Sequence, residues 1–306
     1  MARACDVIVR ARLAGVRERL QRALDDCGDV EAIHQLRVSS RRCFAALDVL
    51  SGWLPEKPRQ KLAKRLRRLR RRCGKARDAD VQDRFLEHLA GEPGRDAIQI
   101  AGLSELRDRL SRRRHKTRRR LRRKLPKLAD RIRRAGRKLI SATTVADSAN
   151  PSNVDPTPLA IVARRILAAE MEAIRVQPTV ETDPPEKLHP LRIACKRLRY
   201  VLEIFIPVLP SEWQSDVYPR LQKLQELLGE IQDGIVGQRS FSGETTWCET
   251  MCDDRSDDAA KMPDTAGVAV SQAVALVQEE YAARVAQAHA TFRSHWRCFC
   301  ESLPAL

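Results

Sequence analysis

The sequence contains two related segments, and this repeat constrains the fold more than any other feature. The segment that begins at His34 aligns without a gap with the segment that begins at His189, 155 residues later. Over residues 34–81, 13 of the 48 aligned positions are identical, and they include His, Gly, Asp and Pro. A bias toward Arg and Leu would not align these four residue types in one register. The repeat therefore indicates that one structural module occurs twice.

Helical periodicity runs through both segments. At 100° per residue, the apolar positions of the segment from His34 gather on one face, as do those of its counterpart from His189. Caps, Gly and Pro predict helices at about 6–25, 32–51, 58–73, 76–90, 97–140, 158–177, 187–206, 213–229, 231–240 and 267–300. Pro126 is a candidate kink. No run of alternating β-branched residues predicts a strand, so the expected fold is all-α.

These elements divide the chain into two repeats. Residues 1–140 make the first repeat, and residues 159–306 make the second. The small, polar and Pro-containing stretch 141–158 is interpreted as a linker. The stretch 242–266 is acidic and weakly periodic, and we interpret it as a surface insertion in the second repeat.

Charge is distributed very unevenly between the two repeats. Residues 1–140 carry 41 Lys and Arg against 17 Asp and Glu, a net charge of +24. Residues 141–306 carry 16 against 23, a net charge of −7. The first repeat should therefore attract polyanions, and its excess of Arg suits phosphate oxygens.

The cations form faces opposite the apolar ones. The first helix of each segment carries such a face, with these residues: His34, Arg37 and Arg41 in one, His189, Arg192, Lys196 and Arg199 in the other. The next helix of the first repeat adds Lys61, Lys64, Arg65, Arg68 and Arg72, followed by Lys75, and its counterpart keeps Arg220 and Lys223. The stretch Arg112–Lys127 is basic nearly all round, so it must face solvent or a polyanion. Most such faces are merely solvated, but here compensating acids are scarce and the His and Arg pair recurs.

The two patterns H-x-L-R-V-x-x-R-R and H-x-L-R-I-x-x-K-R-L-R-Y, each followed by L-x-x-L, Gly and Asp, resemble the conserved histidine α-helical domain (CHAD) family. The resemblance covers about residues 5–240 and 267–300. It implies two four-helix bundles related by pseudo-two-fold symmetry. It also implies a basic cleft between them that binds inorganic polyphosphate, with association to polyphosphate granules in some members. The family's basic positions carry over onto His34, Arg37, Arg41, Arg42, His189, Arg192, Lys196, Arg197 and Arg199.

Two other functions compete with polyphosphate binding. The basic first repeat also suits nucleic acid, although its basic faces carry almost no aromatic residues for base stacking. Some CHAD proteins are fused to a hydrolase with an E-x-E-x-K signature. Glu170-Met-Glu172 is the nearest match here and lacks the Lys. No nucleophile motif or phosphate-binding Gly loop occurs, so we expect neither an enzyme nor a bound cofactor.

The nine cysteines are scattered, and this pattern predicts free thiols in the cytoplasm. Cys248 and Cys252 with Cys298 and Cys300 could be interpreted as a metal site, but the spacing is not that of common zinc sites. No apolar stretch is long enough to span a membrane, so we expect no membrane insertion. The oligomeric state is not predicted.

Overall fold

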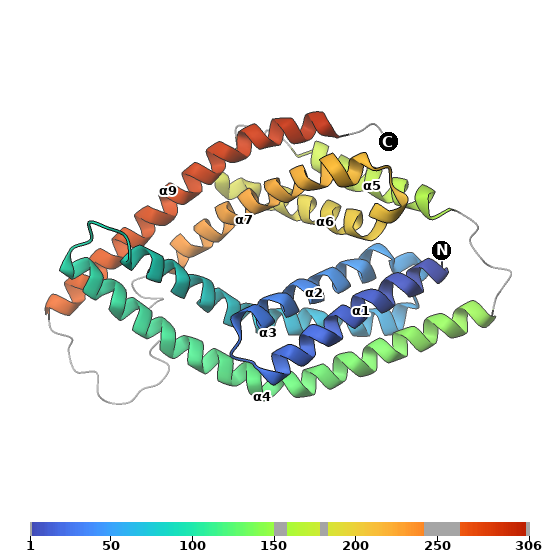
Figure 1. Cartoon of the computed structure of the whole chain (residues 1–306), viewed down its shortest axis with the longest axis horizontal. Coiled ribbons are helices and arrows are strands. Elements are labelled where there is room, and N and C mark those ends of the chain that lie inside the picture. The colour runs from blue at the N-terminus through green and yellow to red at the C-terminus, as the bar shows by residue number, and fades with distance from the viewer. Residues whose placement is uncertain (1, 150–157, 178–182, 242–263, 304–306) are drawn as a thin grey trace.

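The computed structural model describes residues 2–149, 158–177, 183–241 and 264–303, and these residues form helices and short connections without a strand (Figure 1). The expected all-α fold is therefore confirmed. In Figure 1 the N-terminal half lies below the C-terminal half, and the two halves meet along α2 and α6 and again at the left end.

Four long helices build the N-terminal half: α1 (Ala2–Asp25), α2 (Val30–Val49), α3 (Glu56–Ala90) and α4 (Ala97–Ala149). Each helix contacts the next along the chain, and α1 also contacts α4, so the four helices enclose a common core. The start of α2 is set by Asp29, whose side chain accepts a hydrogen bond from the Glu31 N–H at 2.7 Å. This N-cap fixes where the basic face of α2 begins.

The C-terminal half is built from α5 (Leu159–Arg175), α6 (His189–Phe205), α7 (Tyr218–Phe241) and α9 (Asp264–Ser302). Short 3-10 turns flank α6, and a π-helical turn at Trp213–Val217 leads into α7. Helix α5 packs on α6, α6 on α7, and α7 on α9. The acidic stretch 242–266 predicted to be an insertion lies mostly outside the described residues.

Two apolar clusters hold the helices together. The larger one contains buried Leu, Val, Ile and Ala side chains from both halves, so the halves share one continuous core. The smaller one joins the far ends of α3, α4, α7 and α9, where the Phe85 and Tyr281 rings stack with centroids 3.9 Å apart. These four helix ends meet at the left of Figure 1, away from the contact of α2 with α6.

Several helices are longer than predicted. Helix α3 passes through Gly74 and α7 passes through Gly229, where breaks were expected. A Gly within a helix costs only about 1 kcal/mol, which the buried residues on either side outweigh. Helix α4 continues through Pro126 and extends to Ala149, into the stretch predicted to be a linker. Among the described residues, no helix is long and apolar enough to cross a membrane.

A buried carboxylate fastens α3 to α4. The Asp80 side chain is 1% exposed and pairs with Arg114 Nε at 2.7 Å and Arg118 Nη2 at 2.9 Å. The neighbouring Asp83 pairs with Arg114 Nη1 at 2.7 Å. Arg114 and Arg118 are therefore engaged in ion pairs with α3. These pairs determine which side of α4 faces α3.

We predict that Asp80→Asn lowers the free energy of unfolding by about 3 kcal/mol, because the partly buried Arg118 loses its carboxylate partner and Arg114 keeps only Asp83. Urea unfolding followed by circular dichroism measures the change. Asp130→Asn is the matched control, since Asp130 is 60% exposed and meets Arg133 at 3.4 Å. Equal effects of the two substitutions would contradict this role of Asp80.

Candidate functional site

The two helices that carry the repeated His-x-x-Arg pattern, α2 and α6, pack against each other (Figure 1). Their basic faces therefore meet at the junction between the two halves. Both faces are held there by the core positions on the opposite side of each helix, which include Leu36 and Leu47 in α2 and Leu198 and Leu202 in α6.

One carboxylate organises this junction. Glu203 of α6, whose side chain is 9% exposed, pairs with Arg42 Nε of α2 at 2.8 Å and lies 3.8 Å from Arg199 Nε. It also accepts a hydrogen bond from the Tyr218 hydroxyl at 3.2 Å, and its backbone carbonyl accepts one from Arg12 at 2.8 Å. Arg42 therefore serves as an ion-pair bridge between the halves.

Next to this anchor, several donors have no acceptor. Tyr200 is 7% exposed, and its hydroxyl is buried without a hydrogen-bond partner among the described residues. The Nε atoms of Arg41, Arg192 and Arg199 are likewise buried without a hydrogen-bond partner among the described residues. The guanidinium carbons of Arg41 and Arg199 lie 6.0 and 5.5 Å from the centre of the Tyr200 ring. These two arginines and the cations that interact electrostatically with them or with each other form what we call the central cation cluster: Arg37, Arg41, Arg70, Arg192, Lys196 and Arg199.

The pKa shifts show that this cluster is crowded and partly dehydrated. Burial lowers the pKa of Arg41, and Arg199 and Arg70 nearby lower it further. Burial likewise lowers the pKa of Arg70 and of Arg192. Burial, with Arg192 and Arg41 beside it, lowers the pKa of Lys196 to about 7. All these shifts come from disfavoured positive charge, which a bound anion would relieve.

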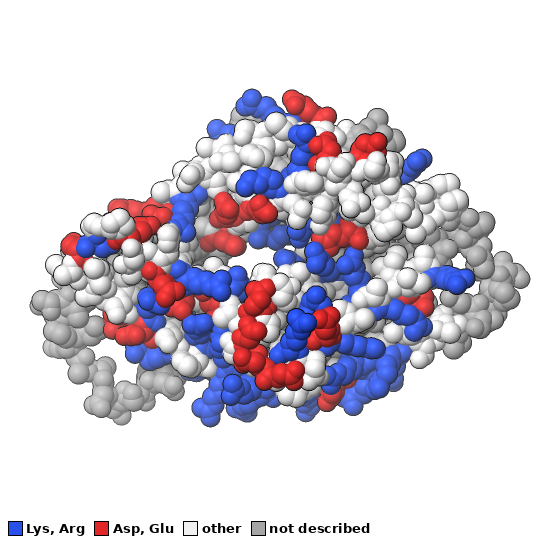
Figure 2. Space-filling model, in the orientation of Figure 1, with Lys and Arg blue, Asp and Glu red and all other residues white. Residues whose placement is uncertain are grey.

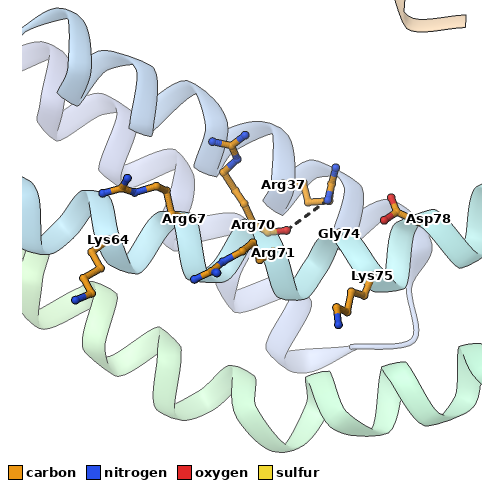
Figure 3. A pocket seen from close by; sticks show the side chains of 8 residues that line it. All are labelled: Arg37, Lys64, Arg67, Arg70, Arg71, Gly74, Lys75 and Asp78. Carbon is orange, nitrogen blue, oxygen red and sulfur yellow. Dashed lines mark hydrogen bonds between the residues drawn. The ribbon is translucent and has the colours of Figure 1, made fainter. Parts of the chain in front are cut away.

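A groove of about 870 Å³ continues the cluster along α3 (Figure 3). Its lining residues are Arg37, Lys64, Arg67, Arg70, Arg71, Gly74, Lys75 and Asp78. Arg37 Nη1 donates to the Arg70 carbonyl oxygen at 3.4 Å, across the backbone of Gly74. Arg67 and Arg70 each lie 5.6 Å from the centre of the Phe44 ring. Six cations and one carboxylate thus surround an open groove that suits an extended anion.

Comparison with known proteins agrees with this architecture. Residues 7–241 match the model of the CHAD domain family. The chain belongs to the CHAD domain family. The crystal structure of the CHAD domain from the plant Ricinus communis is 23% identical, with a TM-score of 0.69, covering 100% of this chain and 93% of that one. PptA from Streptomyces chartreusis is 17% identical, with a TM-score of 0.62, covering 97% of this chain and 99% of that one. No curated protein matches this CHAD protein.

The two histidines of the CHAD pattern occupy different environments. His34 is half-buried, and burial together with nearby Arg77 lowers its pKa, which disfavours the charged form of its ring. His189 is exposed, and its Nδ1 lies 2.5 Å from Gln232 Oε1. The charged form of His34 is therefore disfavoured beside the cations of α2, whereas His189 is engaged with Gln232 of α7.

Some predicted site residues lie away from the junction. Arg197 points to α5, where its Nε and Nη2 donate to the Glu170 carboxylate at 3.0–3.2 Å. Arg220 is exposed, pairs with Asp216 at 2.6 Å and reaches the Cys298 carbonyl of α9. Lys223 is exposed and lies 3.8 Å from Glu226. These contacts tie neighbouring parts of the C-terminal half together.

On α3 the structure selects a different flank from the predicted one. Of the predicted residues, Lys64 and Lys75 line the groove, and Lys61, Arg65, Arg68 and Arg72 are not among its lining residues. Arg67, Arg70 and Arg71 line it instead, which the sequence did not predict. Cations surround the apolar stripe of α3 on both flanks, so periodicity alone could not decide which flank faces α2.

Among the described residues, no group of three or more His, Cys, Asp and Glu side chains is placed to hold a metal ion. Cys298 and Cys300 are exposed on α9, whereas Cys248 and Cys252 lie outside the described residues. The buried thiols of Cys43, Cys73 and Cys195 have their pKa raised to about 12 by burial. These three thiols are therefore protonated and unsuited to nucleophilic chemistry.

Gly74 and Gly229 allow a matched test of how Arg37 is positioned. A Cβ atom at Gly74 would lie 2.6 Å from Arg37 Nη1, whereas one at Gly229 would have no neighbour within 4 Å. We predict that Gly229→Ala stabilises the protein by about 1 kcal/mol through helix propensity and that Gly74→Ala gains less, because Arg37 must move. Urea unfolding measures both; equal gains would show that Gly74 does not constrain Arg37.

The low pKa of Lys196 predicts a pH-dependent stability. Because its folded pKa of about 7 lies below its ordinary 10.5, the unfolded chain binds more protons between these values, and stability rises with pH across this range. Below pH 7 Lys196 is charged in the folded protein as well, so its burial lowers the free energy of unfolding by the full amount. Lys196→Met should therefore stabilise the protein at pH 6 by on the order of 1 kcal/mol, with a smaller gain at pH 9. Unfolding curves at both pH values test this, and a gain independent of pH would refute it.

Proposed function

We propose that this CHAD protein binds inorganic polyphosphate, without catalysing a reaction, at the central cation cluster and the adjoining groove on α3. The observation that carries the proposal is the set of buried donors without acceptors, from Arg41, Arg192, Arg199 and Tyr200. A polyphosphate chain consists of repeated phosphate groups whose oxygens accept such hydrogen bonds and carry the opposite charge.

The energetics of the cluster support a ligand of this kind. Burying a charged donor without an acceptor is costly, and a protein recovers that cost only if something else supplies the acceptor. Glu203 and Asp233 are the acids nearest to α6 cations of the cluster, at 3.8 Å from Arg199 and 3.9 Å from Arg192. Neither separation is that of a tight ion pair, so the cluster keeps an excess of positive charge for a bound anion.

The proposal includes the origin of the site by duplication. The two halves would be two copies of one four-helix module, with Arg37 and Arg192 at matching positions of α2 and α6. The copies have diverged on the next helix, where Gln222 and Gln225 occupy the positions that correspond to Arg67 and Arg70. A bound chain would therefore contact both copies at the junction and then follow α3 of the first.

We also propose that the protein does not catalyse a reaction and that it associates with polyphosphate granules. The groove on α3 presents one carboxylate, Asp78, among six cations, an arrangement that favours holding an anion over activating water. Purified protein incubated with polyphosphate and Mg²⁺ should release no orthophosphate. Release that depends on the cation cluster would establish an enzyme instead.

We predict that Arg41→Gln and Arg192→Gln each weaken binding of fluorescent long-chain polyphosphate at least tenfold, because each removes a charged group whose buried Nε has no hydrogen-bond partner among the described residues. Fluorescence anisotropy measures the affinity, and circular dichroism should show an unchanged helix content. Arg220→Gln combined with Lys223→Gln is the control that leaves the junction intact. Unchanged affinity in both single variants would remove the site assignment.

Nucleic acid is the competing partner, because the charge excess attracts any polyanion. Unlabelled single-stranded DNA of equal total charge should displace the polyphosphate poorly. The buried donors of the junction can be reached by a narrow phosphate chain more readily than by a strand with bulky bases. Equal displacement by DNA would overturn the polyphosphate specificity while leaving a general polyanion-binding protein.

A further inference from the structure

Helix α4 carries far more positive charge than its packing uses. Between Arg112 and Lys138 it contains 16 Lys and Arg and a single carboxylate, Asp130. The inward-facing cations are paired: Arg114 and Arg118 meet Asp80 at 2.7 and 2.9 Å. Many of the remaining cations face outward, and those named next form no ion pair with a neighbouring helix among the described residues.

These outward cations form a continuous line. We call the following exposed residues the outer stripe: Arg112, Arg119, Arg123, Lys127, Arg134 and Arg137. At 1.5 Å per residue the line is about 38 Å long. From Arg119 onward, none of its members has a carboxylate within ion-pair distance among the described residues, and Asp130 on the same side is paired with Arg133 at 3.4 Å. In Figure 2, Lys and Arg gather along the lower edge, where Figure 1 shows α4.

Other surface helices are built differently. On α1, Arg10 pairs with Asp6 at 2.6 Å and Arg22 pairs with Glu18 at 3.0 Å, both at the i,i+4 spacing that stabilises a helix. On α4 that spacing joins like charges, as in Arg119 with Arg123 and Arg123 with Lys127, and such pairs repel. The outer stripe thus lowers the stability of its own helix, and its excess positive charge attracts anions.

The position and composition of the outer stripe indicate which polyanion it meets. Residues 112–138 contain no Phe, Trp or Tyr, so the stripe has no platform on which bases could stack. Helix α3 packs on α4, and its exposed side carries Lys64, Arg71 and Lys75 of the groove. A flexible phosphate chain that leaves the groove therefore passes these cations on its way to α4.

We propose that the outer stripe of α4 is a second polyphosphate-binding surface, which makes the protein selective for long chains. The inference rests on polyphosphate binding at the central cation cluster. Once one part of a chain occupies the cluster, the rest is held at high local concentration beside α4, so the second contact forms within the same complex. A chain too short to reach α4 gains nothing from the stripe.

The test uses the full-length protein and two ligands, tripolyphosphate and long-chain polyphosphate, each measured by competition against the same fluorescent polyphosphate. The stripe variant combines Arg119→Gln, Arg123→Gln and Lys127→Gln. The control variant combines Arg164→Gln, Arg165→Gln and Arg175→Gln, which removes three exposed cations from α5. Both variants change the net charge equally, and neither touches a buried residue.

The stripe variant should bind long chains at least tenfold more weakly and tripolyphosphate within about twofold of the unmodified protein. Its salt dependence for long chains should fall by roughly two to three ion equivalents. The control variant should keep the long-chain affinity within about threefold. Equal losses in the two variants would overturn the proposal, because net charge alone would then explain them.

Two further outcomes separate the hypotheses. If the stripe variant loses affinity for an RNA oligonucleotide but not for long-chain polyphosphate, the stripe is a nucleic-acid surface and the proposal is overturned. If the unmodified protein binds neither tripolyphosphate nor long chains, the proposed function itself fails. If it binds tripolyphosphate and long chains equally well, only the role of the stripe is refuted.

Discussion

The ion pair between Arg42 of α2 and Glu203 of α6 is the contact on which the arrangement of this CHAD protein depends. Glu203 is nearly buried, and it also receives Arg12 at its carbonyl and the hydroxyl of Tyr218. A single carboxylate therefore counters the charges that would otherwise drive two basic helix faces apart. Because it satisfies Arg42 and only approaches Arg199, it permits contact between the faces without neutralising them.

This partial neutralisation explains the properties of the candidate site. The remaining cations are dehydrated by the contact of α2 with α6, which lowers the pKa of Arg41, Arg192 and Lys196. Uncompensated positive charge at the junction lowers the stability of the fold. The same charge would pair with a bound anion, so a residue that favours binding here disfavours stability. The smaller apolar cluster around Phe85 and Tyr281 joins α3, α4, α7 and α9 away from this contact, and so holds the two halves together at a second place.

The sequence predicted the helical class, the repeat and the family from local patterns. Periodicity placed Leu36 and Leu47 in the core, which their burial confirms, whereas Arg37 and Arg41 on the opposite side are partly buried. Helix ends were less certain, since Gly74 was expected to break a helix that packing in fact carries through. The helix-propensity cost of one Gly, about 1 kcal/mol, is smaller than the stabilisation from burying the apolar face of the helix.

What the sequence determined by itself was which residues could share a helix face, because that follows from 100° per residue and from the repeat in register. Which cations meet was decided only by the tertiary structure. Arg197 and Arg42 occupy equivalent positions of the repeat, yet one pairs with Glu170 within the C-terminal half and the other bridges to Glu203. Arg67 and Arg70 were indistinguishable from Arg65 and Arg68 until α2 packed beside one flank of α3. Helical periodicity fixes directions about one axis, whereas the partner on each side depends on how separate helices pack.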